Sequence, residues 1–135
     1  MDINTSLLTY VWTALTTDAT LVSLMGSDFK VYENWAAPDA TFPYMVYRLR
    51  LLPDMTSNVE YALLHLDIWD DSTTSTKVKA IRAQVMVLLD GKMFNATDFS
   101  NVLIRRTQPD EPVVEIEEYI QHHTTTFDLR FFKYT

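Results

Sequence analysis

Cysteine is absent from this 135-residue sequence, and glycine occurs only at positions 26 and 91. The lack of thiols excludes disulfides, cysteine nucleophiles and cysteine-ligated zinc. Two glycines are too few for a phosphate-binding loop, a dinucleotide-binding fingerprint or a G-x-S-x-G nucleophile elbow. No apolar run approaches the roughly 18 residues of a membrane span, and the first residues lack the basic leader of a secretion signal. We therefore expect a soluble, uncleaved protein that does not contact a membrane.

Basic residues are also scarce, with 11 Lys and Arg against 18 Asp and Glu, which gives a formal net charge of -7. This deficit disfavours a nucleic-acid-binding protein, because such affinity rests largely on Lys and Arg contacts to phosphate. The basic pairs, Arg48 with Arg50 and Arg105 with Arg106, are expected on exposed strand faces. Apolar residues make up 47% of the chain, enough for one sizeable core, so we expect a single domain over residues 1–135.

Apolar residues at helical spacing predict two helices near the start of the chain. Ser6 is a candidate N-cap for a helix that reaches Thr17, and Asp18 is a candidate N-cap for a second, shorter helix. Gly26 stands where a helix readily ends in a left-handed residue. The residues expected on the inner faces are Leu8, Val11, Trp12 and Leu15 in the first helix and Leu21, Leu24 and Met25 in the second.

The next segments predict a β-hairpin. A brief strand at 29–32 and a loop stiffened by Pro38 and Pro43 precede strands at 44–52 and 59–69, which are separated by turn-forming residues. Alternation divides the second strand into two faces. Ala62, Leu64, Leu66 and Ile68 are expected in the core, and Tyr61, Leu63, His65, Asp67 and Trp69 on the other side. Because both faces carry large side chains, we expect either the first helix or a neighbouring subunit to cover the second face.

The rest of the chain predicts a long helix and two more strands. Asp70, Asp71 and Ser72 are interpreted as capping residues of a helix that ends before Gly91. A strand at 102–107, an acidic loop at 110–118 and a long inner strand at 119–134 follow. The inner face of the helix is expected to contain Val78, Ile81, Val85 and Leu88. The predicted fold is α+β, with an antiparallel or mixed sheet of four to five strands and a long helix and an N-terminal helix pair packed on it.

The sequence gives little support for an enzymatic function. His65 and Asp67 point the same way on a strand, and His122 or His123 could approach them, which leaves a small metal-dependent hydrolase as the alternative from another functional class. Adjacent His122 and His123 should face opposite sides of a sheet, however, and zinc-binding spacing is absent. No serine occupies a strand-to-helix elbow. We therefore expect no enzyme activity, no catalytic residue, no metal and no cofactor.

The order of signals resembles the tail-completion or tail-terminator proteins of long-tailed phages and prophages over nearly the whole chain. The resemblance rests on D-A-T-L-V-S-L-M-G at 18–26, K-V-Y at 30–32 and A-P-D-A-T-F-P-Y-M-V-Y at 37–47, in which Phe42-Pro43-Tyr44 is most characteristic. It continues with L-H-L-D-I-W at 64–69, L-L-D-G at 88–91 and T-T-F-D-L-R-F-F at 125–132. The acidic segment at 110–118 is not part of the pattern, which could also extend to neck proteins on the head side of the junction.

The resemblance implies a homomeric, usually six-fold ring at the head-proximal end of the tail tube. Such a ring stops tube growth and joins the tube to the head connector, in the virion and, during assembly, in the host cytoplasm. It contacts itself, the tube protein and the connector protein, and DNA passes through without specific binding. The candidate interface residues are Trp35, Met55, Tyr61 and Trp69. The candidate lumen-facing acidic residues are Asp110, Glu111, Glu115, Glu117 and Glu118.

Overall fold

A computed structural model gives the fold and describes residues 3–26, 30–51, 59–72, 74–95, 99–106, 111–113 and 120–133. The helices are α1 (Ile3–Thr17), α2 (Ala19–Met25) and α3 (Thr76–Leu89). The strands are β1 (Val31–Glu33), β2 (Tyr44–Leu51), β3 (Val59–Asp70), β4 (Met93–Phe94), β5 (Phe99–Arg106), β6 (Glu111–Val113) and β7 (Gln121–Lys133). The predicted α+β class is confirmed, although the sheet has more strands than expected.

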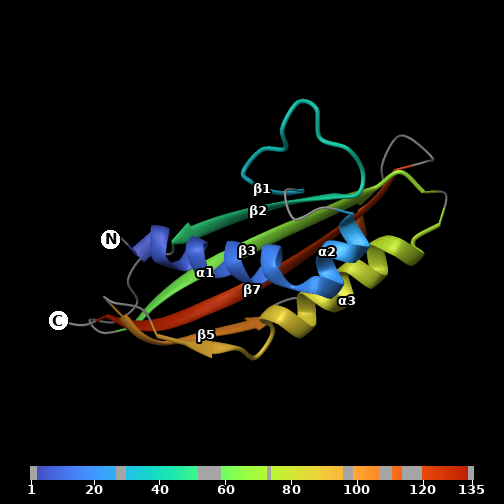
Figure 1. The fold of residues 1–135 in the computed structure, drawn as a ribbon. Helices are drawn as coiled ribbons and strands as arrows, with labels where there is room; N and C mark the ends of the chain where they lie inside the picture. The colour runs from blue at the N-terminus through green and yellow to red at the C-terminus, as the bar shows by residue number, and fades with distance from the viewer. Residues whose placement is uncertain are drawn as a thin grey trace.

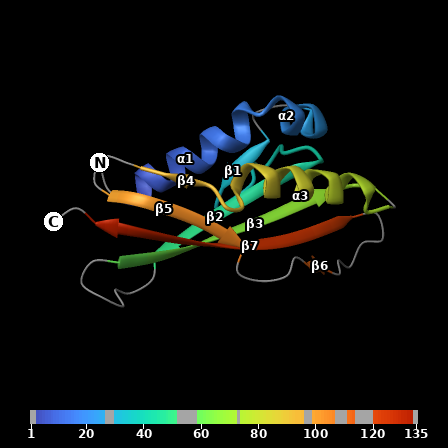
Figure 2. The same ribbon diagram turned by 90° about the horizontal axis from the view of Figure 1, so that it is seen from below.

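One mixed sheet contains all seven strands in the order β1-β2-β3-β7-β5-β4, with β6 also paired to β7 (Figures 1 and 2). β1 runs parallel to β2, and every other pairing is antiparallel. The predicted hairpin of β2 and β3 is present, and β7 lies inside the sheet as predicted. β4 was not predicted, and part of the expected acidic loop forms β6 at the side of β7.

The three helices lie on one face of the sheet (Figure 2). α1 packs on β1 and β2, α3 packs on β3 and β7, and α2 contacts both other helices. Alternation along β3 buries the predicted core set, Ala62, Leu64, Leu66 and Ile68, completely. These residues meet three fully buried side chains of β7, which are Phe127, Leu129 and Phe131. The opposite face, called the outer face below, therefore has no helix on it among the described residues.

The helix starts differ in part from the prediction. Asp18 caps α2 as expected, because its carboxylate accepts a hydrogen bond from the Leu21 amide at 2.9 Å, and Gly26 follows the helix with φ +83°. Ser6 lies inside α1 and does not begin it. Asp70 is the last residue of β3 and is 3% exposed, so it does not cap α3; Ser75 occupies that position.

The buried faces of the helices are turned slightly from the expected ones. In α1, Leu7 is buried together with Val11 and Leu15, whereas Trp12 is 45% exposed and Leu8 is partly buried. In α3, the last buried position is Leu89 and not Leu88. The other predicted positions, which are Val11 and Leu15 in α1 and Val78, Ile81 and Val85 in α3, are buried as expected, so only one edge of each buried stripe differs. Where two apolar residues are adjacent in sequence, contacts with the sheet decide which of them is buried.

Tyr47 lies on the helix side of β2 and is 3% exposed. Its surroundings include α1, which contributes Leu8, Thr9 and Trp12 to a hollow shared with Glu33 and Tyr47. Burial, with a smaller contribution from Glu33, raises the pKa of the Tyr47 phenol to about 12. This shifted group therefore reports the packing of α1 on the sheet.

Candidate functional site

The outer face of the sheet carries a row of aromatic rings from separate segments of the chain. Tyr44 of β2 stacks on Trp69 of β3 with ring centroids 5.2 Å apart, and Trp69 stacks on His122 of β7 at 4.2 Å. Phe42, just before β2, extends the row with a centroid 5.3 Å from that of Tyr44. The register places Tyr44, Trp69 and His122 directly opposite one another on adjacent strands, which brings their rings together.

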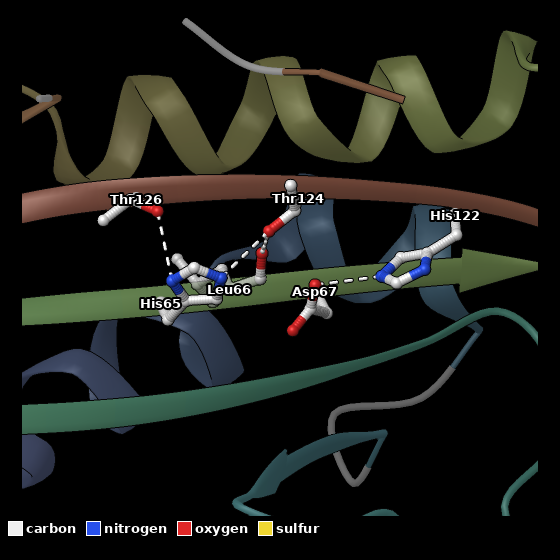
Figure 3. Close-up of polar contacts among 6 residues, drawn as sticks. All are labelled: His65, Leu66, Asp67, His122, Thr124 and Thr126. Atoms are coloured by element: carbon white, nitrogen blue, oxygen red, sulfur yellow. Dashed lines mark hydrogen bonds and ion pairs between the residues drawn. The ribbon is translucent and has the colours of Figure 1, made fainter. Parts of the chain in front are cut away.

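The imidazole of His122 also contacts Asp67. His122 Nε2 lies 2.9 Å from Asp67 Oδ1, and both side chains are largely covered (Figure 3). Burial raises the pKa of Asp67, but the hydrogen bond and charge of His122, with Thr124 and His65, outweigh burial and hold this pKa below its ordinary value. Asp67 is therefore an anion at neutral pH, held between two strands.

His65 is fixed by two hydroxyl groups. Thr124 Oγ1 lies 3.2 Å from His65 Nε2, and Thr126 Oγ1 lies 3.1 Å from His65 Nδ1 (Figure 3). A hydroxyl can donate or accept, so the pair satisfies both nitrogens of a neutral imidazole in either tautomer. Both rings on this face are thus oriented by neighbouring strands.

The contacts described above divide the polar side chains of this face into two groups. Asp67 contacts His122, and the hydroxyls of Thr124 and Thr126 contact His65. His123 is buried on the opposite side of β7, as the alternation of the strand predicts. Within the described ranges, no group of three or more potential metal ligands occurs.

Two hollows open on the outer face. One, of about 510 Å³, is lined by Asn34, Arg48, Leu49, Arg50, Leu63, His65 and Thr126. The other, of about 260 Å³, is lined by Asn34, Trp35, Ala36, Tyr44, Val46, Arg48, Asp67 and Trp69. Asn34, which follows β1, lines both hollows, and Trp35 and Ala36 line the smaller one. Sequence reasoning did not find these hollows, because they depend on how residues distant in sequence meet on the sheet.

The structure brings two of the predicted interface residues together. Trp35 is 84% exposed and lines the smaller hollow with Trp69. Tyr61 also lies on the outer face, but eight residues along β3 from Trp69, a separation of roughly 27 Å at strand spacing. Met55 lies outside the described residues. The first helix does not cover this face, so that explanation of its large side chains is wrong.

The predicted acidic residues are described only in part. Glu111 belongs to β6 and pairs with Thr124 of β7, while its side chain is not described. Asp110, Glu115, Glu117 and Glu118 lie outside the described residues. Their position relative to a lumen therefore stays a prediction. No described helix is both long and apolar enough to cross a membrane.

The fold is shared with known structures, although no protein-family model and no curated protein matches the chain. A chain from the virion of a native gene transfer agent particle superposes with a TM-score of 0.71 and 15% sequence identity, covering 98% of this chain and 99% of that one. A second solved structure, which has no descriptive name, gives a TM-score of 0.60 and 10% identity over 99% and 98% of the two chains. At these identities the similarity concerns the fold.

Proposed function

We propose that this protein is a non-enzymatic assembly protein of a phage-like virion, which caps the head-proximal end of the tail tube as a homo-oligomeric ring and joins the tube to the head connector. The single observation that carries the proposal is the aromatic outer face, on which the exposed Trp35 and the partly exposed Tyr44 and Trp69 gather around a hollow. Clusters of large aromatic side chains that remain accessible to solvent on one face are typical of protein contacts.

Two further findings support the same role. The chain from the gene transfer agent virion has this fold over almost its entire length, so a domain of this architecture and size occurs in a phage-like particle. The sequence motifs at 18–26, 37–47, 64–69 and 125–132 resemble those of tail terminators. The same fold similarity would suit a neck protein on the head side of the junction, which is the competing assignment.

A ring needs two different patches on each subunit, so that each copy contacts the next in the same way until the circle closes. We assign Trp35, Met55, Tyr61 and Trp69 to such contacts, with the subunit, the tube or the connector as partners. Asp110, Glu111, Glu115, Glu117 and Glu118 are assigned to the lumen. A negative wall would repel the phosphates of DNA and let it pass without binding.

The test is a growth assay with purified tube protein from the same phage or prophage. Tubes are assembled with the wild-type protein, with a Trp35→Ala and Trp69→Ala double variant, or without addition, and their lengths are measured by negative-stain microscopy. The proposal predicts short, limited tubes only with wild-type protein. Equal lengths in all three samples would contradict it, and binding to purified connector but not to tubes would favour the head-side assignment.

The lumen assignment has its own test. A Glu115→Lys and Glu117→Lys double variant is compared with the wild-type ring for retention of duplex DNA at physiological salt. We expect DNA retention only by the variant, because added lysines create phosphate contacts. Retention of DNA by the wild-type ring would contradict a repelling wall.

A further inference from the structure

The edge of β2 that faces away from β3 is paired over only part of its length. β1 pairs with Met45, Val46 and Tyr47, and β2 continues past β1 to Leu51 (Figure 1). Within the described ranges no strand pairs with this edge from Arg48 to Leu51. This stretch is called the open edge of β2 below. Unpaired backbone groups on such an edge can bind an extended segment of another chain.

The hydrogen bonds at β1 show which backbone groups the open edge offers. The Met45 amide donates to the Lys30 carbonyl at 3.0 Å, and the Asn34 amide donates to the Tyr47 carbonyl at 2.9 Å. Both bonds lie on the side of β2 away from β3, and alternate residues of a strand direct their N–H and C=O groups to the same edge. The N–H and C=O of Leu49 therefore point to the open edge, where the described strands offer them no partner.

Positive charge lies beside the open edge on the outer face. Arg48 and Arg50 are exposed and line the larger hollow together with His65. Neither guanidinium makes an ion pair with another described residue. Asp67, which lines the smaller hollow with Arg48, contacts His122 instead. Two arginines therefore remain without an anionic partner among the described residues, in a chain whose net charge is -7.

The helix side of the same edge is apolar. Leu49 and Leu51 alternate with the two arginines along β2 and pair with the buried Leu64 and Ala62 of β3, so they lie on the helix side of the sheet. Leu49 packs against the core, whereas Leu51 is 45% exposed. A strand added to the open edge would thus have an apolar neighbour on one side and the arginines on the other.

This combination selects the chemistry of the occupant. Residues two positions apart on a strand lie on the same side, roughly 6–7 Å from each other. Carboxylates at alternate positions of an added strand would lie opposite Arg48 and Arg50, and the apolar residues between them would lie beside Leu51. Duplex DNA could contact the two charges, but it has no extended backbone to pair with the N–H and C=O groups of the edge. The observations therefore favour a protein segment over nucleic acid.

The described strands of this chain do not supply such a segment. Among them, none has two acidic residues two positions apart. We infer that the open edge of β2 binds, as an added strand, an extended segment of another protein in which acidic and apolar residues alternate. Backbone hydrogen bonds at Leu49 provide affinity, and Arg48 and Arg50 select the acidic side chains. This contact is not among those assigned to the ring, and its tests do not depend on the tail role.

The first experiment measures binding of a fluorescein-labelled peptide, T-V-E-V-E-V-T, to the full-length protein by anisotropy at low salt. Arg48→Glu with Arg50→Glu should weaken binding about tenfold or more, since two attractive charge contacts become repulsive. The matched control is Lys77→Glu with Lys79→Glu, which changes charge equally on exposed positions of α3 and should leave binding unchanged. No binding by wild-type protein, or equal weakening in both variants, would overturn the inference.

The second experiment separates strand addition from charge attraction alone. Two further peptides of the same sequence carry N-methyl groups, one on the glutamate amides and the other on the valine amides. Because alternate amides of a strand face opposite edges, only one of the two sets can donate to the open edge. Methylation of that set should abolish binding, and methylation of the other set should preserve it. Equal effects of the two methylations would overturn strand addition.

The remaining experiments test two other occupants. Binding of duplex DNA to wild-type protein that is lost with Arg48→Glu/Arg50→Glu would assign the edge to phosphate. Self-association of wild-type protein in sedimentation velocity that is lost with the same variant would assign the edge to a second copy. Either result would overturn the inference, which predicts that the variant changes neither property. Circular dichroism of each variant ensures that a loss of binding is not a loss of fold.

Discussion

The alkaline stability of the protein should depend on one buried phenol. Tyr47 is 3% exposed, and its pKa is raised from 10.0 to about 12 in the folded chain. Because the unfolded chain loses this proton first, folding loses stability as pH rises above 10, and the loss is complete above about 12. At about 1.36 kcal/mol per pH unit, the loss from this group is about 1.4 kcal/mol at about pH 11 and approaches about 2.7 kcal/mol beyond about pH 12.

The assay compares wild type with Tyr47→Phe by urea unfolding at pH 8 and pH 11. Phe keeps most of the packing and removes the titrating hydroxyl, so the difference between the two proteins should shift by about 1.4 kcal/mol in favour of Phe from about pH 8 to 11. In thermal unfolding the corresponding shift is about 5 °C. An unchanged difference would show that the phenol titrates as in the unfolded chain and would contradict the packing of α1 over Tyr47.

The remaining predictions concern the helix start, the outer face and the core. Asp18→Ala should cost about 1–2 kcal/mol of unfolding free energy by urea denaturation. The variant removes two hydrogen bonds of the Asp18 carboxylate, one from the Leu21 amide that caps α2 and one from Gln84 Nε2 at 2.9 Å. Asp67→Asn should be less stable than wild type at pH 7, because the pKa of Asp67 is held below its ordinary value of 3.8 in the folded chain. This contribution should fade as pH falls below 3.8, and near-equal stabilities at pH 7 would contradict the stabilising contact between Asp67 and His122. Ile68→Ala should cost about 2–5 kcal/mol by loss of core packing. Trp69→Ala should lower stability less than Ile68→Ala yet weaken self-association more, as sedimentation would show; the reverse order would place Trp69 in the core.

The strand faces could be predicted because alternation is a local property of the sequence. Four consecutive inward positions of β3 are apolar, so only one assignment buries them, and the structure confirms it. Asp18 and Gly26 were also predictable, because a carboxylate before an apolar stripe and a glycine after it act on their own backbone.

The wrong predictions concern positions at which the local sequence suits two structures about equally well. Leu7 and Leu8 are adjacent, so either could face the core, and contacts with the sheet decided for Leu7. Asp70 suits a helix start chemically, but pairing with Gln121 extends β3 through it and leaves Ser75 to precede α3. The short strands β4 and β6 exist because β5 and β7 offer them partners, which periodicity does not reveal.

For the outer face, the sequence predicted which residues share a side of the sheet, but not which of them contact one another. Asp67 and His122 are 55 positions apart in sequence, and His65 and Thr126 are 61 apart. Their meeting depends on the register between β3 and β7, which a single sequence does not fix. The hollows beside Arg48 and Trp35 likewise depend on the path between β1 and β2.

Electron microscopy of tail tubes mixed with the purified protein tests the central claim most directly. The account predicts a ring of identical subunits at one end of each tube, the head-proximal end, with the opposite end bare. Tubes with bare ends at saturating protein, or protein distributed along the tube wall, would contradict it.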